Sequence, residues 1–176
     1  CVLIKLKEKL AKKKKEHGLT EAEQKEQKEL KDRRLHNTRL LLRNYRMLRE
    51  SCSKAIYQKE HSEKSTEEVI EDLMSMRASD GVIVNSIKES AERTGIIISH
   101  VDRMLDVFRM YCGKCGEKEK RQYKVIKSMY ITKEGSSAAE LAKKFGVSKV
   151  TIYDDIKTAE ERLSALFFGI NGLRFY

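Results

Sequence analysis

The sequence contains no proline and no tryptophan, and only 7% of its 176 residues are aromatic. Because proline is absent, no predicted helix is interrupted by a missing backbone N–H. The sequence also lacks an alternation of Val, Ile, Thr and Tyr long enough to form the strands of a sheet. Together with a charged fraction of 36%, these absences predict an all-α protein.

Long apolar runs and a disulfide framework are missing as well. No run approaches the roughly 20 apolar residues of a membrane span, so we expect no membrane partner. Lysines interrupt the opening stretch CVLIKLKEKL, which therefore does not resemble a signal peptide. The first residue is Cys1 rather than Met, as expected of a trimmed chain or a fragment. Four cysteines at mostly apolar helical positions fit reduced thiols, and hence a cytoplasmic location.

The residue patterns of catalysis are also absent. The sequence has no phosphate-binding glycine loop, no His/Asp/Glu group with metal-ligand spacing, and no serine or cysteine with a recognisable base. Cys112 and Cys115 form a lone CxxC, whereas a zinc site needs four ligands. One interpretation of this motif is that the neighbouring glycines form a hinge and the cysteines have no function of their own. The other is a zinc site shared by two chains, or a redox pair. We expect no enzyme and no cofactor.

Charge is plentiful but uneven. Residues 1–60 hold 18 Lys+Arg against 9 Asp+Glu, residues 61–110 hold 6 against 10, and residues 111–176 hold 13 against 8. The net charge of +10 is therefore concentrated at the two ends of the chain. Such basic ends would attract a polyanion such as double-stranded DNA. The alternative is that these charges only line helix faces exposed to solvent and bind no partner.

The N-terminal part predicts a basic arm and one long helix. Residues 1–19 are rich in lysine, and Thr20 with Glu23 has the capping-box spacing that begins a helix. We expect this helix to run to about Gln58. On one side of this helix, apolar residues recur every three or four positions, and this stripe needs another apolar surface to pack against. Arginines occupy the opposite side of the helix. The stripe is Leu41, Tyr45, Leu48, Cys52 and Ala55; the arginines are Arg39, Arg43, Arg46 and Arg49.

The middle of the chain carries a second, longer stripe. Ser65 or Thr66 caps a short helix, and a turn is expected at 79–81. The stripe that follows predicts a helical hairpin with the first stripe, or a coiled coil across a homodimer. Gly95 suggests a kink, and residues 117–120 suggest a polar linker. The stripe is Val84, Ile87, Ala91, Thr94, Ile98, Val101, Leu105, Phe108 and Cys112.

Residues 136–163 predict a helix-turn-helix. Ser136 or Ser137 caps the first helix, with Glu140 near the capping-box position. Gly146 supplies the positive φ of the tight turn, and Ser148 caps the second helix. A helix over 121–131 completes the trihelical core. The apolar residues 166–173 either fold back on this core or present an interaction patch.

The second helix of this motif has one face free for DNA. Ile152, Ile156 and Ala159 turn inward, so the opposite face enters the major groove. Lys149 and Tyr153 suit base edges or phosphates, and the other lysines suit phosphates. Val150 suits a thymine methyl, and Ser148 suits a phosphate. Asp154 and Asp155 repel phosphates, although Asp154 also suits a cytosine amino group. The predicted DNA-binding residues are Lys143, Lys144, Ser148, Lys149, Val150, Thr151, Tyr153, Asp154 and Lys157.

This C-terminal region is similar to region 4 of bacterial sigma factors, and more so to the ArpU/RinA group of late transcriptional regulators of phages of Firmicutes. The shared features are Ala142, 146–148, 151–153 and 161–163. The resemblance covers about residues 121–173. It implies a transcription regulator in a bacterial host that contacts promoter DNA and RNA polymerase.

Three functions follow from these observations. The first is a sequence-specific regulator built from a basic arm (1–19), a hairpin or coiled-coil module (20–116) and a helix-turn-helix domain (117–176). The second is a phage DNA-packaging subunit, similar to small terminases, that oligomerises through its long helices. The third is a polymerase-binding adaptor that uses the apolar tail.

Overall fold

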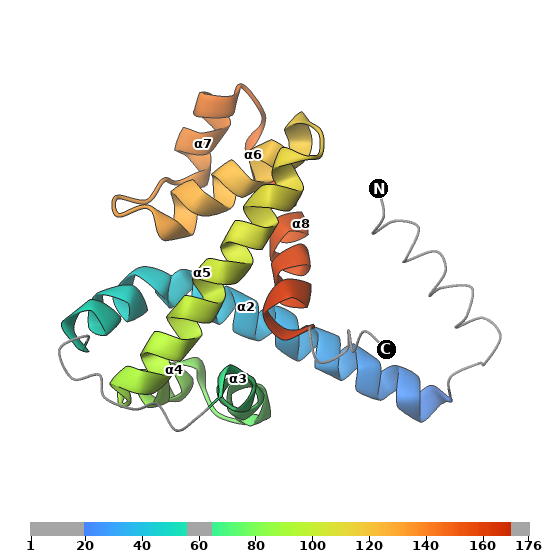
Figure 1. The fold of residues 1–176 in the computed structure, drawn as a ribbon. Helices are drawn as coiled ribbons and strands as arrows, with labels where there is room; N and C mark the ends of the chain where they lie inside the picture. The colour runs from blue at the N-terminus through green and yellow to red at the C-terminus, as the bar shows by residue number, and fades with distance from the viewer. Residues whose placement is uncertain (1–19, 56–64, 170–176) are drawn as a thin grey trace. The chain divides into compact units, whose positions relative to one another are not determined.

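The computed structural model describes residues 20–55 and 65–169, and every regular element in these ranges is helical, as the sequence predicts. The basic arm over residues 1–19 and the last part of the apolar tail lie outside the described residues. The elements, drawn in Figure 1, are α2 (Glu21–Ala55), α3 (Thr66–Ser75), α4 (Asp80–Lys88), α5 (Ala91–Gly113), α6 (Glu117–Ile126), the π-helical turn η2 (Lys127–Ile131), α7 (Ala138–Phe145) and α8 (Lys149–Phe168).

Of the described residues, 34–55 and 65–169 belong to one compact unit, and 20–33 belong to a separate one. The main hydrophobic core of the larger unit collects side chains from α2, α3, α4, α5, α6 and α8. A second, smaller core joins α6, α7 and the first half of α8. Two helices, α6 and α8, therefore contribute to both cores. The division of the chain at residues 116 and 117 stays a prediction.

Helix α2 begins where its capping box predicts. The Thr20 backbone N–H donates to Glu23 Oε2 at 2.7 Å, and the Glu23 backbone N–H donates to Thr20 Oγ1 at 3.3 Å. Leu41, Tyr45 and Leu48 are buried in the main core together with the stripe of α5. Tyr45 also donates its hydroxyl to Asp102 of α5 at 2.5 Å. The two apolar stripes thus pack against each other within one chain.

The second stripe is divided between two helices, and the break between them lies before Gly95. Helix α4 ends at Lys88, and α5 begins at Ala91. Ser90 caps α5, because its hydroxyl accepts from the Arg93 N–H at 3.1 Å. Ala91 therefore lies in the first turn after the break and is exposed, contrary to the expected continuous seam. Gly95 sits inside α5, which runs without a break from Ala91 to Gly113.

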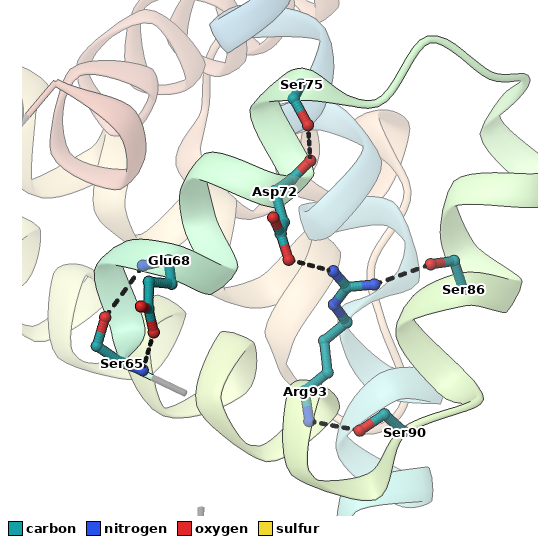
Figure 2. Close-up of polar contacts among 7 residues, drawn as sticks. All are labelled: Ser65, Glu68, Asp72, Ser75, Ser86, Ser90 and Arg93. Atoms are coloured by element: carbon teal, nitrogen blue, oxygen red, sulfur yellow. Dashed lines mark hydrogen bonds and ion pairs between the residues drawn. The ribbon is translucent and has the colours of Figure 1, made fainter. Parts of the chain in front are cut away.

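A polar cluster joins α3, α4 and α5 (Figure 2). The Arg93 guanidinium of α5 donates to Ser86 Oγ of α4 at 3.0 Å and to Asp72 Oδ2 of α3 at 2.8 Å. Ser65 and Glu68 form the capping box of α3, which settles the choice between Ser65 and Thr66. Arg93 thus holds together α3, α4 and α5, three helices that contribute to the main core.

Residues 117–120 are the first turn of α6, not a linker. Gly116 is the N-cap, and Glu117 and Glu119 occupy the first turn, where carboxylates interact favourably with the helix dipole. This charged run carries no apolar stripe, which is why it was expected to be a polar linker. Val125 and Ile126 follow as fully buried residues, and the π-helical turn η2 then closes the helix.

His100 connects α5 to the end of α8. Its Nε2–H donates to the Phe167 carbonyl at 2.9 Å, and the ring is buried. Burial lowers the pKa of His100 below its usual 6.5 and outweighs the hydrogen bond to Phe167, which raises it. Nearby Arg103 lowers this pKa further, and Glu67 raises it. The folded protein therefore binds this proton less readily than the unfolded chain does.

A His100→Gln variant should lose part of the acid sensitivity of the protein. Above pH ~6.5 neither state carries the proton, and as pH falls below that value the unfolded state takes it up first, so stability declines. Gln keeps a donor for the Phe167 carbonyl but does not titrate. Urea unfolding between pH ~7.5 and ~5 should give a shallower loss of unfolding free energy for the variant, by at most about 1.4 kcal/mol per pH unit. Equal slopes would contradict the assignment.

Among the described residues, no helix has both the length and the apolar character needed to cross a membrane.

Candidate nucleic-acid interface

Helix α7 is the first helix of the predicted helix-turn-helix. Ser137, not Ser136, is its N-cap: the Glu140 N–H donates to Ser137 Oγ at 3.2 Å, and the Ser137 N–H donates to Glu140 Oε2 at 2.7 Å. This hydrogen bonding lowers the pKa of Glu140. Leu141 and Ala142 are buried in the smaller core, as their spacing predicts. The capping box and this buried face fix where α7 begins and how it packs.

The turn between α7 and α8 is a Schellman motif. Gly146 adopts φ 64° and ψ 35°, the left-handed conformation that glycine adopts without steric cost. The Val147 N–H donates to the Ala142 carbonyl at 3.0 Å, and the Gly146 N–H donates to the Lys143 carbonyl at 3.4 Å. Phe145 and Val147 pack on the smaller core from either side of the glycine. The turn therefore has the geometry that the sequence predicts.

A Gly146→Ala substitution should reduce the free energy of unfolding by roughly 1–2 kcal/mol, the cost of a Cβ in the left-handed region. A methyl group at this position would meet no atom within 4 Å, so steric contact adds nothing. Gly81→Ala is the matched control, because it also has open space but lies in helical conformation. The control should be neutral or stabilising by up to about 1 kcal/mol. Similar losses for both variants in urea unfolding would exclude backbone strain as the cause.

Helix α8 has one buried and one exposed face. Ser148 caps it, since its hydroxyl accepts from the Thr151 N–H at 3.0 Å and also bonds the Thr151 hydroxyl at 2.9 Å. Ile152, Ile156 and Ala159 are buried, as predicted. Val150 and Tyr153 are 68% and 60% exposed, the two highest values among the large apolar side chains of the described residues. The first two turns of α8 thus offer a free surface that mixes apolar and basic groups.

The predicted DNA-binding side chains share this surface. Lys149, Asp154 and Lys157 are exposed beside Val150 and Tyr153, and Thr151 is half-buried. Lys143 and Lys144 are exposed in the last turn of α7, and Lys144 Nζ lies 5.9 Å from the centre of the Phe145 ring. No predicted residue is covered by the protein itself apart from this partial burial of Thr151. Their contacts with DNA stay a prediction.

Asp155 does not face DNA, contrary to the expectation that both aspartates repel phosphates. Its side chain is 1% exposed, and Arg121 Nε of α6 donates to Asp155 Oδ2 at 2.6 Å. Gln122 Nε2 donates to Asp155 Oδ1 at 3.4 Å, and Arg162 Nη1 donates to Gln122 Oε1 at 2.7 Å. The sequence contained the signal: Asp155 lies three residues after Ile152 and four before Ala159, on the inner stripe.

Three of the four arginines on the predicted basic side of α2 contact other helices, and only Arg43 makes no such contact with the residues that the structure describes. Arg39 Nε donates to Glu160 Oε2 of α8 at 2.7 Å. Arg46 Nε donates to the Tyr130 carbonyl at 3.1 Å, and its Nη2 donates to the Met129 carbonyl. Arg49 is paired with Asp102 of α5. Sequence reasoning missed these roles, because contacts between residues so distant along the chain leave no local pattern.

Tyr130 lies beside the Arg39–Glu160 pair. Its hydroxyl donates to Glu160 Oε1 at 3.4 Å. Burial raises the pKa of Tyr130, the nearby Glu160 carboxylate raises it further, and Arg43 and Arg39 lower it. The phenol therefore stays protonated at neutral pH and serves as a donor to the carboxylate.

Cys112 and Cys115 flank the turn between α5 and α6. Cys112 is buried, and this burial raises the pKa of its thiol to about 11, which disfavours the thiolate needed for metal binding or redox chemistry. Both cysteines, and Cys52, are free thiols. Among residues 20–55 and 65–169, no three His, Cys, Asp or Glu side chains gather into a group that could hold a metal ion.

Comparison with known proteins agrees with this geometry. Residues 121–173 match a family model described as an HTH domain, and this range includes most of α6, the whole of α7 and α8, and the turn between them. No curated protein and no solved structure matches the chain. The match and the exposed face of α8 together support a helix-turn-helix DNA-binding protein.

Proposed function

We propose that this protein is a sequence-specific transcription regulator that reads promoter DNA with the first turns of α8. The surface for this task consists of predicted residues that the fold leaves accessible. Lys143, Lys144 and Lys157 contact phosphates and set the register. Lys149 and Tyr153 meet base edges or phosphates, and Val150 and Asp154 meet base edges in the major groove. This is a binding function without catalysis, carried out where the DNA of a bacterial host is found.

The observation that carries the proposal is the exposure of Val150 and Tyr153, at 68% and 60%, between Lys149 and Lys157. Exposed apolar groups reduce solubility and contribute nothing to the core. Beside lysines, at the start of a helix that follows a Schellman turn, they are the groups that discriminate base pairs in a major groove. Because Asp155 is neutralised by Arg121, only Asp154 opposes the phosphates on this face.

The resemblance to sigma region 4 and to ArpU/RinA regulators supports a finer form of the proposal. The resemblance rests in part on 146–148 and 151–153, which are the turn and first turn of α8. In this form the protein is a phage or prophage regulator that also contacts RNA polymerase. Glu161 is exposed on the second half of α8 and is available for a protein partner.

Selection of bound fragments from random and genomic DNA, at fixed salt, tests the proposal. A reader of promoter DNA should enrich one sequence motif and bind it about 10³-fold or more tightly than unrelated duplex. The salt must be controlled because phosphate contacts alone give salt-dependent, sequence-independent binding. Retention of DNA without any enriched motif would contradict sequence-specific reading.

The mass of the protein in solution distinguishes the proposed regulator from the alternative function, a phage DNA-packaging subunit. The stripes of α2 and α5, which were candidates for oligomerisation, share one core within the chain. A monomer or dimer is therefore expected by light scattering, and a ring of many copies would favour packaging.

A further inference from the structure

The protein-facing side of α8 contains two carboxylates. The side chain of Asp155 is 1% exposed and that of Glu160 is 6% exposed. A buried carboxylate is costly unless it is paired and hydrogen-bonded, and both are. Ion pairs between well-packed helices add little net stability, so their use here calls for another explanation.

Each carboxylate ties α8 to a different helix. Asp155 is held by Arg121 Nε at 2.6 Å, and Arg121 belongs to α6. Glu160 is held by Arg39 Nε at 2.7 Å, and Arg39 belongs to α2, 121 positions away in the sequence. The two anchors are five residues apart on α8, or about one and a half helical turns. Two directional contacts at different positions along the axis of α8 restrict both the rotation of this helix about its axis and its tilt.

Helix α2 contacts the same region at a second point. Arg46 lies seven residues after Arg39, about two turns along the same side of α2. Its guanidinium donates to the carbonyls of Met129 and Tyr130 at the end of η2. A Cβ added to Gly135, in the loop before α7, would lie 2.7 Å from Arg46 Nη2. The guanidinium of Arg46 is thus close to the loop that leads into α7.

We propose that the Arg39–Glu160 ion pair makes α2 a positioning element for the recognition helix. The inference rests on the proposed reading of DNA by α8. Because α8 is one continuous helix from Lys149 to Phe168, the rotation fixed at Glu160 is passed on to Tyr153 and the lysines. Recognition by side chains requires placement within about 0.5 Å and 10–20°, and apolar packing alone permits small rotations. Glu160 and Arg39 are positioning residues and do not touch the DNA.

The test measures three quantities for the full chain: affinity for the site enriched by selection, affinity for an unrelated duplex of equal length, and unfolding by urea. Arg39→Gln removes the charged partner of Glu160, leaves the hydrogen bond from Tyr130, and keeps most of the side chain at position 39. Because the Arg39 side chain is 39% exposed, this variant is expected to fold. Its ratio of specific to nonspecific affinity should fall about tenfold, comparable to one mismatched base pair.

Two further variants separate positioning from a loss of charge or stability. Arg39→Lys should recover part of the ratio, because the ammonium can still donate to the carboxylate. Arg39→Gln combined with Glu160→Gln should bring the ratio back to within about twofold of the unmodified protein, because both groups become neutral and can pair.

Two controls are matched to the test variants. Arg43→Gln removes one charge from an exposed position of α2, and should weaken binding to both duplexes equally. Arg93→Gln breaks another ion pair between helices, that of Arg93 in α5 with Asp72 in α3, which does not include α8. It should lower the unfolding free energy and leave the specificity ratio unchanged.

The outcomes distinguish this inference from the proposed function. An unmodified protein that enriches no motif would overturn both. A specific protein whose ratio is unchanged in Arg39→Gln would overturn the positioning role and leave the proposed function standing. If Arg39→Gln fails to fold, the double variant decides: a ratio that stays tenfold low in a folded protein overturns the role, and a recovered ratio supports it.

Discussion

Replacing Lys149 and Tyr153 together with alanine should abolish sequence-specific binding while leaving the fold intact. Both side chains are exposed, and substitutions of this kind change stability by about 0.5 kcal/mol or less. Each good contact to a base edge contributes about 1–3 kcal/mol of discrimination, so losing two should weaken specific binding by about 10²-fold or more. Gel-shift titration of the selected fragment, with circular dichroism as a check on folding, measures both.

The single variants show what each residue does. If Lys149 contacts a phosphate, Lys149→Ala should weaken binding to all sequences equally and reduce the slope of log affinity against log salt by about 1. If it contacts a base, the preference at one position of the motif should relax instead. Lys88→Ala with Met110→Ala is the control, because it removes one exposed lysine and one exposed apolar group far from α8 along the chain. Unchanged binding by the Lys149 and Tyr153 variants would refute the assignment of the recognition face.

Replacing Phe167 with alanine should produce the largest loss of stability. Phe167 is 1% exposed and lies in the main core, where its ring is 6.4 Å from that of His100 and 6.2 Å from that of Phe168. Truncation of a buried Phe to Ala costs roughly 3–5 kcal/mol, a large part of the 5–15 kcal/mol that stabilises a typical domain. Specific DNA binding should weaken as well, because the C-terminal half of α8 anchors the half that carries the recognition face.

Chemical denaturation followed by circular dichroism measures this effect. Met110→Ala provides the comparison: Met110 lies on α5 and is 54% exposed, so its truncation should change the unfolding free energy by about 0.5 kcal/mol or less. A loss below about 1 kcal/mol for Phe167→Ala would mean that the end of α8 contributes little to the core.

Local features of the fold were predictable from the sequence. The capping residues Thr20, Ser65, Ser137 and Ser148 act where they were expected, because a cap depends on residues only three positions apart. The left-handed Gly146 was predictable for the same reason. The buried face of α8 follows from helical periodicity, which also leaves the opposite face for DNA. These inferences need no knowledge of what a helix packs against.

Misassignments in the sequence analysis concern elements whose signal is weak or ambiguous. Residues 117–120 have no apolar pattern, so the glycine N-cap and the first-turn glutamates of α6 went unrecognised. The stripe from Val84 to Cys112 predicted one helix, but the helix is interrupted between Lys88 and Ala91. The interruption is only two residues long and leaves the spacing of three and four residues unchanged, so the sequence pattern does not reveal it. The break in the helix lies at 89–90, before Ala91, whereas Gly95 is part of the unbroken helix α5.

The sequence by itself determined the helical class, the helix-turn-helix and the side of α8 that is free, because these depend on composition and on spacing within a few turns. Only the tertiary structure decided the roles of charged residues. Arg39 looks like a solvated surface group in the sequence, and the place of Asp155 on the inner stripe of α8 does not reveal its partner, yet they pair with Glu160 and Arg121 in the folded protein. The physical reason is that the free energy of a charge depends on which opposite charge lies beside it, and chain topology alone brings those partners together.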